Sequence, residues 1–260
     1  MLAVTETQLM TWLAAFLWPF LRVSVFVVTA PVLGTRALPA RVRLIFAVGL
    51  TIILVPLGGM VAPAGPILSP TGLVIAVQQV LIGATLGLVL RAIFLVFEFS
   101  GQIVAQQMGL GFAAMVDPAS GAQVPVVSQL YATLGILMFL AFNGHLQLIE
   151  LLVNSFTLMP PGTNGITRAA LAFVIDWIGQ LLAMGISLML PAIAALLIVN
   201  LVFGVIARSA PQFNIFSIGF PILILFGIAV LLMMSGILAD QMEAVFTAGF
   251  TTAYEVLRRP

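Results

Sequence analysis

The chain has 260 residues, of which 62% are hydrophobic and only 7% are charged, and its net charge is +1. Soluble domains typically carry about 25% charged residues, so this chain cannot cover itself with a water-compatible surface. The near-zero net charge gives no attractive field for nucleic acid, and the absence of cysteine excludes disulfides and thiolate metal sites. We therefore predict an integral membrane protein of the all-α class, because a lipid-facing backbone must satisfy its hydrogen bonds internally.

Proline, glycine and charged residues divide the chain into about six long hydrophobic segments. These are 9–33, 42–62, 71–107, 126–143, 173–207 and 215–239. As single helices, 71–107 and 173–207 would be about 55 and 52 Å long, against a hydrocarbon core of about 30 Å. Both are therefore expected to break, tilt strongly or extend beyond the bilayer. Pro191 offers a break in the second, because proline removes an i→i−4 hydrogen bond.

The charges only half obey the positive-inside rule. The basic connection 36–43 predicts a cytoplasmic loop, whereas Arg258 and Arg259 fall on the opposite side if the spans alternate regularly. Arg22 lies inside the first segment, where a central charge costs about 2.5–3.5 kcal/mol on insertion scales. This pattern argues against conventional spanning, and Arg22 is expected to need a partner in its apolar surroundings.

Segment 71–107 carries a polar stripe. The stripe consists of Arg91, Glu98, Gln102 and Gln106. At 100° per residue these side chains fall within about 80° of one another. They form either a solvated face or a face turned toward another subunit or a pore; we favour the latter, because an unpaired charge in an apolar setting is costly. Gln79 leads into the stripe, and Gly83-x-x-x-Gly87 permits close helix approach, so both glycines are predicted to serve packing.

Two connections complete the candidate sites. Loop 108–125 mixes large apolar side chains with turn-forming residues, which is unusual for a surface loop. Its candidate residues are Met108, Gly109, Leu110, Gly111, Phe112, Met115, Asp117 and Pro118. The turn into the last helix is bracketed by Pro211, Asn214, Gly219 and Pro221. There we expect a structural role, with Asn214 capping the helix and Pro221 kinking it.

Five strings of unusual sequence occur in one order and spacing. They are Phe16–Val23, Gln78–Gly83, Gln107–Ala113 with Val116–Pro118, Phe142–His145 and Ala210–Pro221. In this arrangement the chain resembles the FliR family of flagellar type III export-gate proteins, from the first helix to about residue 235. The resemblance implies a FliP-like helical part, 1–172, fused to a FliQ-like helical hairpin with a C-terminal tail, 173–260.

The resemblance also implies partners and a role. It places the chain in the flagellar basal body at the bacterial inner membrane, in a hetero-oligomeric helical complex with FliP-like and FliQ-like subunits. FlhB-like and FlhA-like export proteins are further expected partners, and unfolded flagellar proteins would pass through the gate. It further suggests that loop 108–125 is a plug that seals the gate, for which flexible methionine side chains are suited; from the residues alone, an interfacial or re-entrant loop remains open.

We interpret the chain as a structural, non-enzymatic export subunit. The sequence contains no nucleophile–base pair, P-loop, dinucleotide fingerprint or metal motif, so neither cofactor nor metal is expected. The alternative is a self-contained small-solute transporter or channel. That alternative predicts an inverted repeat and broken helices that converge on a midplane site, and the two halves show no clear repeat.

Overall fold

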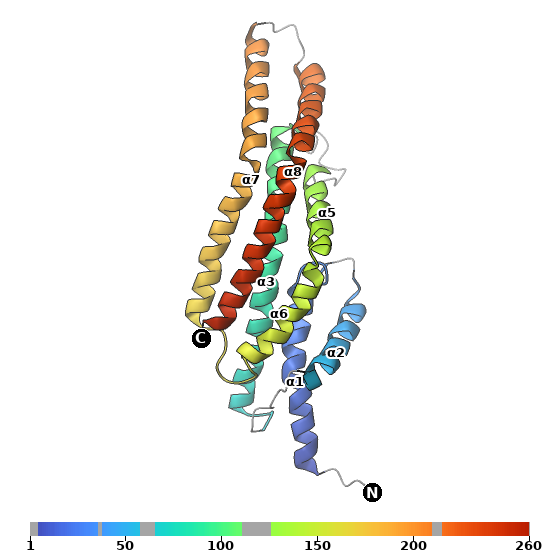
Figure 1. Cartoon of the computed structure of the whole chain (residues 1–260), viewed down its shortest axis with the longest axis vertical. Helices are drawn as coiled ribbons and strands as arrows, with labels where there is room; N and C mark the ends of the chain where they lie inside the picture. Colours follow the sequence, from blue (N-terminus) through green and yellow to red (C-terminus); the bar gives the residue numbers. More distant parts are fainter. Residues whose placement is uncertain (1–4, 36–37, 58–65, 111–125, 210–214, 260) are drawn as a thin grey trace. The chain divides into compact units, whose positions relative to one another are not determined.

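The computed structural model describes residues 5–35, 38–57, 66–110, 126–209 and 215–259, and over these ranges it contains helices and no strand. The helices are α1 Glu6–Thr29, α2 Ala40–Leu57, α3 Pro70–Gln107, α5 Val126–Ala141, α6 Gly144–Leu158, α7 Arg168–Ser209 and α8 Ile215–Arg258 (Figure 1). Among these described helices, four are long and apolar enough to cross a membrane, and a fifth span results if α5 and α6 form one. The prediction of an all-α, membrane-type protein is confirmed.

The ends of α1 follow directly from its sequence. The backbone N–H of Gln8 donates to the Thr5 hydroxyl at 3.4 Å, and the Thr5 N–H donates to the Gln8 side chain at 3.1 Å. This capping box satisfies two amides that the first turn would otherwise leave unpaired. Ala30 ends the helix with φ −62° and ψ 147°, because the residue before a proline, here Pro31, is driven out of the helical region.

The long apolar runs do not break. α3 has 38 residues, α7 has 42 and α8 has 44, which correspond to about 57, 63 and 66 Å. The break that Pro191 offered does not occur, since α7 continues through it; a kink at Pro191 stays a prediction. A proline inside a helix costs about 3 kcal/mol, and buried neighbours on both sides, Met189 and Ala192, hold the two turns in place.

Helix α6 lies where the sequence suggested only a connection between 143 and 167. The missed helix is amphipathic rather than wholly apolar, and its exposed face carries Gln147 and Glu150. Its buried residues are Gly144, Leu148, Leu151, Leu152, Ser155 and Phe156, which is the i, i+4, i+7, i+8 spacing of a helix with one apolar stripe. Because α6 contains no unbroken apolar run, the hydropathy pattern did not predict it. The same criterion predicted that the last helix ends near residue 239, whereas α8 runs to Arg258.

The chain forms two compact units, each discontinuous in sequence. The first comprises residues 1–92, 143–178 and 247–260, and the second comprises 93–142 and 179–246. The predicted division at residue 172 is based on similarity to FliP-like and FliQ-like proteins, whereas these two units are defined by contacts within the chain. The predicted division is not tested by them and stays a prediction.

In the first unit, α1 packs closely on α2 and α3. Ala14 and Trp18 of α1 bury Ile75 of α3 in one apolar cluster. A Cβ on Gly83 would lie 2.5 Å from the Arg22 carbonyl oxygen, and one on Gly87 would overlap the Thr29 side chain. The two glycines therefore do what their spacing predicts: they let α3 lie against the backbone of α1.

The second unit has an aromatic core. Phe94 and Phe97 of α3, Phe139 of α5 and Phe246 of α8 meet with ring centroids 5.4–6.4 Å apart, several of them edge to face. Such geometry adds about 0.5–1.5 kcal/mol per pair beyond the burial of apolar area. This cluster fixes α3, α5 and α8 to one another within the unit.

Candidate functional site

The buried charge of the first helix is satisfied inside the chain. Arg22 is fully buried, and its Nε donates to Gln79 Oε1 at 2.9 Å. One terminal nitrogen donates to the Ser155 carbonyl oxygen at 2.7 Å and to the Ser155 hydroxyl at 3.2 Å. The other donates to the Met159 carbonyl oxygen at 2.7 Å, and the guanidinium carbon lies 4.3 Å from the centroid of the Phe156 ring. We refer to these five residues as the Arg22 cluster.

The Arg22 cluster contains no carboxylate, so the positive charge of the guanidinium is balanced by the dipoles of carbonyl, amide and hydroxyl groups. Ser155 and Met159 lie at the C-terminal end of α6, where unpaired carbonyls and the helix dipole present partial negative charge. Arg22 therefore caps α6 from a different helix. The partners that Arg22 was expected to need lie within the chain. They are Gln79 on α3 and, at the end of α6, Ser155 and Met159; the hydropathy pattern did not predict α6.

Gln79 belongs to this cluster rather than to an exposed face. Its side chain is fully buried, and within the described residues its amide nitrogen has no hydrogen-bond partner. By contrast Arg91, Glu98, Gln102 and Gln106 are all exposed. Within the described residues neither Arg91 nor Glu98 forms an ion pair; the ion pair in this part of the chain joins Arg259 to Glu255, at 3.6 Å, near the end of α8. The role of this stripe as a contact with another subunit stays a prediction.

Residues 108–110, the described part of the predicted plug loop 108–125, form the C-terminal cap of α3. The Leu110 N–H donates to the Ala105 carbonyl at 3.1 Å and the Gly109 N–H donates to the Gln106 carbonyl at 3.0 Å. Gly109 has φ 78°, so these two hydrogen bonds form a Schellman motif with glycine in its left-handed position. Gly109 thus ends α3, whereas the sequence suggested only a place in a plug.

Two further contacts fix this end of α3 within the second unit. The Asn200 side chain of α7 donates to the Gln107 carbonyl oxygen at 3.0 Å, so one of the last carbonyls of α3 is capped. Met108 is buried and fills the notch over Gly227 of α8, where an added Cβ would lie 2.6 Å from the methionine side chain. Met108 is therefore a packing residue at the base of the loop.

Of the remaining candidate residues, some lie within the described residues and others do not. Gly219 is buried and Pro221 exposed inside α8, and the expected structural role of both stays a prediction. Several residues lie outside the described residues. These are Gly111, Phe112, Met115, Asp117, Pro118, Pro211 and Asn214.

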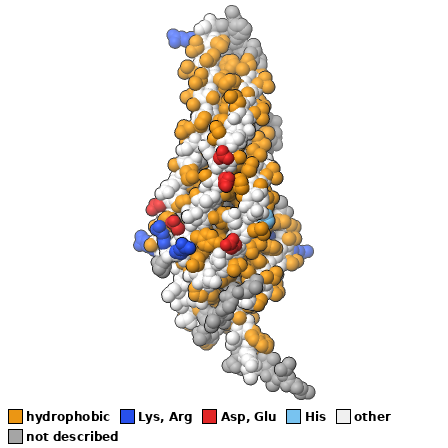
Figure 2. Space-filling view, viewed as in Figure 1, with side chains coloured by type: hydrophobic (Ala, Val, Ile, Leu, Met, Phe, Trp, Pro, Cys, Tyr) orange, Lys and Arg blue, Asp and Glu red, His pale blue; other side chains and the backbone are white. Residues whose placement is uncertain are grey.

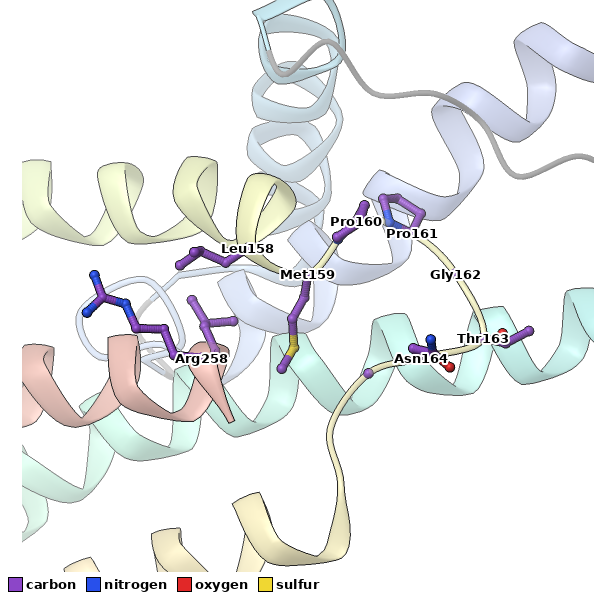
Figure 3. A pocket seen from close by; sticks show the side chains of 10 residues that line it. Leu158, Met159, Pro160, Pro161, Gly162, Thr163, Asn164 and Arg258 are labelled. Carbon is purple, nitrogen blue, oxygen red and sulfur yellow. The ribbon is translucent and has the colours of Figure 1, made fainter. Parts of the chain in front are cut away.

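A cavity of about 550 Å³ lies in the first unit. It is lined by residues 158–165, between α6 and α7, and by Leu257 and Arg258 at the end of α8. Figure 3 shows the loop leaving the end of α6 through Pro160 and Pro161 and returning at Asn164. The lining offers backbone groups and a few polar side chains, and no group of three metal-ligating residues occurs within the described part of the chain. Met159 links the cavity to the Arg22 cluster, since its carbonyl oxygen accepts from Arg22.

Comparison with known proteins gives a consistent family. The model of "Bacterial export proteins, family 1" matches residues 13–249. The flagellar biosynthetic protein FliR of Escherichia coli (strain K12) is 38% identical over 257 residues, covering 99% of this chain and 98% of its own length. FliR of Pectobacterium carotovorum is 35% identical over the same length. FliR of Bacillus subtilis (strain 168) is 28% identical over 246 residues, 94% of each chain. A family match across nearly the whole chain and 38% identity to a full-length relative place this protein in the FliR family of bacterial export proteins.

Proposed function

We propose that this protein is a structural, non-enzymatic subunit of the flagellar type III export gate at the bacterial inner membrane. In this proposal it forms part of the passage for unfolded flagellar proteins, beside FliP-like and FliQ-like subunits and close to FlhB-like and FlhA-like proteins. Family membership supports a role in the flagellar export apparatus and does not favour a self-contained small-solute transporter.

The observation that carries the proposal is the apolar surface of the long helices. On α7, exposed large apolar side chains run from Leu171 to Ile206, a distance of about 53 Å at 1.5 Å per residue. Figure 2 shows hydrophobic side chains over much of the described surface in one view. A bilayer core covers about 30 Å, so lipid alone leaves part of this surface in water. Neighbouring apolar helices of other subunits would cover the remainder.

The test is expression of the tagged chain with and without its FliP-like and FliQ-like partners. We expect the chain alone to aggregate or be degraded in mild detergent, and the co-expressed chain to elute as one complex whose composition native mass spectrometry resolves. A long-lived monomer that conducts small ions in liposomes would contradict the proposal and favour the transporter.

The plug is a second part of the proposal. Apolar side chains in a constriction exclude water and thereby oppose ion flow. The structural cap at Gly109 suggests a sharper variant than removal of the whole loop: deletion of residues 111–114, which leaves the Schellman motif intact. We expect the complex to assemble and the membrane to leak small ions. The length-preserving change of Phe112 and Met115 to serine is the matched variant, and an intact, tight complex in both would contradict the plug.

A further inference from the structure

The side-chain amide of Gln79 is satisfied at one end and not at the other. Its Oε1 accepts from Arg22 Nε at 2.9 Å, whereas its Nε2 has no hydrogen-bond partner among the described residues, although the side chain is fully buried. The orientation of the amide is fixed, because the guanidinium can only donate and the amide oxygen must face it. A buried donor without an acceptor is costly and rare in folded proteins. An acceptor is therefore required beside Nε2.

The preceding residue of α3 has the complementary deficit. Gln78 Oε1 is buried, and in the part of the chain that the structure describes it has no donor. An added Cβ on Gly165 would overlap this oxygen, so the Gln78 side chain lies against the loop that joins α6 to α7. Figure 3 shows α3 passing beneath this loop. An unpaired donor and an unpaired acceptor thus occur on consecutive residues, close to the same loop.

The cavity of about 550 Å³ in the first unit lies at this loop. Gly165, which contacts Gln78, is one of its lining residues, and Met159 is another. The Met159 carbonyl oxygen accepts from Arg22, and a carbonyl oxygen has a second lone pair. A buried water needs about 10–15 Å³ and two to four polar partners. The cavity is therefore large enough for water and is bordered by groups that can bind it.

We propose that ordered water of this cavity extends to α3, where it accepts from Gln79 Nε2 and donates to Gln78 Oε1. Water fits both glutamines because it donates as well as accepts. A metal ion cannot accept from Gln79, and an anion cannot donate to Gln78. The buried guanidinium of Arg22 then has a hydrated side beyond Gln79, which reduces the cost of burying its charge. The inference concerns the first unit by itself and does not depend on the proposed function.

The direct test is a density map of the assembled complex in which ordered waters are resolved. We expect one water about 2.7–3.2 Å from Gln79 Nε2 and one at a similar distance from Gln78 Oε1. A protein oxygen at that distance from Gln79 Nε2 would overturn the proposal. So would a map that resolves waters in the cavity and none beside the two glutamines.

A second test changes a donor into an acceptor. Gln79→Glu keeps the size of the side chain and the oxygen that Arg22 needs, and it replaces Nε2 by an oxygen. A water can turn and donate to this oxygen, whereas a fixed protein acceptor would repel it. We expect Gln79→Glu to leave the thermal midpoint of the co-expressed complex unchanged or higher. Gln129→Glu, at an exposed position outside the polar stripe, is the matched control and should not change the midpoint.

The lower reference is Gln79→Met, which leaves Arg22 Nε without its acceptor. It should lower the midpoint by about 2 °C or more. A fall of Gln79→Glu to the level of Gln79→Met, or loss of the Gln79→Glu chain from the membrane, would contradict the water site. If Gln79→Met does not accumulate at all, the comparison of Gln79→Glu with the unmodified chain still decides the outcome.

Discussion

Replacement of Arg22 by methionine is predicted to destabilise the first unit although the substitution removes a charge from an apolar segment. The change leaves the Gln79 Oε1 and the Met159 carbonyl oxygen without the donors that they now have. The Ser155 carbonyl oxygen keeps one partner, because the Met159 N–H donates to it at 3.0 Å. Two buried groups are therefore orphaned.

The magnitude follows from these two groups. An unsatisfied buried polar group costs about 1–3 kcal/mol, so the loss is about 2–6 kcal/mol before the relief of no longer burying a charge. That is a large share of the roughly 5–15 kcal/mol that stabilises a typical domain. Arg22→Lys should be intermediate, since an ammonium lacks the planar fork that reaches acceptors on α3 and α6 together.

The assay is the thermal midpoint of the co-expressed complex in mild detergent, with the amount of chain in the membrane as a second readout. Arg168→Met is the matched control, because Arg168 is exposed, lies outside the polar stripe and forms no ion pair within the described residues. We expect Arg22→Met to lower the midpoint by about 4 °C or more, on a scale of about 2–4 °C per kcal/mol. Equal midpoints for the two variants would refute the view that Arg22 stabilises the end of α6.

Three further changes test other parts of the structure. Gly87→Leu should push α3 away from Thr29 and abolish accumulation of the chain, whereas Gly204→Leu, which has open space at its Cβ, should accumulate normally in immunoblots of membranes. Gly109→Ala should lower the free energy of unfolding by about 1–2 kcal/mol, seen as a lower thermal midpoint, because φ is 78° there. Gly109→Asn should lower it less, and an equal loss of stability in both variants would argue against the left-handed cap. Glu98→Ala should reduce co-purification of partners if a neighbouring donor pairs with it, and unchanged co-purification and export would mean that the exposed stripe is solvated.

The sequence by itself was sufficient to predict the apolar surroundings of this protein, its all-α fold class and its family. Its composition leaves no alternative to apolar surroundings, and in such surroundings only helices satisfy a run like 71–107 internally. The spacing of Gly83 and Gly87 was sufficient to predict close packing, because two glycines one turn apart expose backbone on one helical face. Those inferences depend on local chemistry or on periodicity, both of which are written along the chain.

Only the tertiary structure decided where polar groups find partners. Arg22 was expected to need a partner, and the sequence did not show which: one acceptor, Gln79, lies on α3, and two lie more than 130 residues away at the end of α6. Gly109 was predicted as part of the plug loop, and the structure shows that it also caps α3, an end that Asn200 and Gly227 from other helices fix in place; the plug stays a prediction. The physical reason is that hydrogen bonds and cavities form between elements that are distant in sequence. Hydropathy reports how apolar a segment is, and it is silent on which buried donor meets which acceptor.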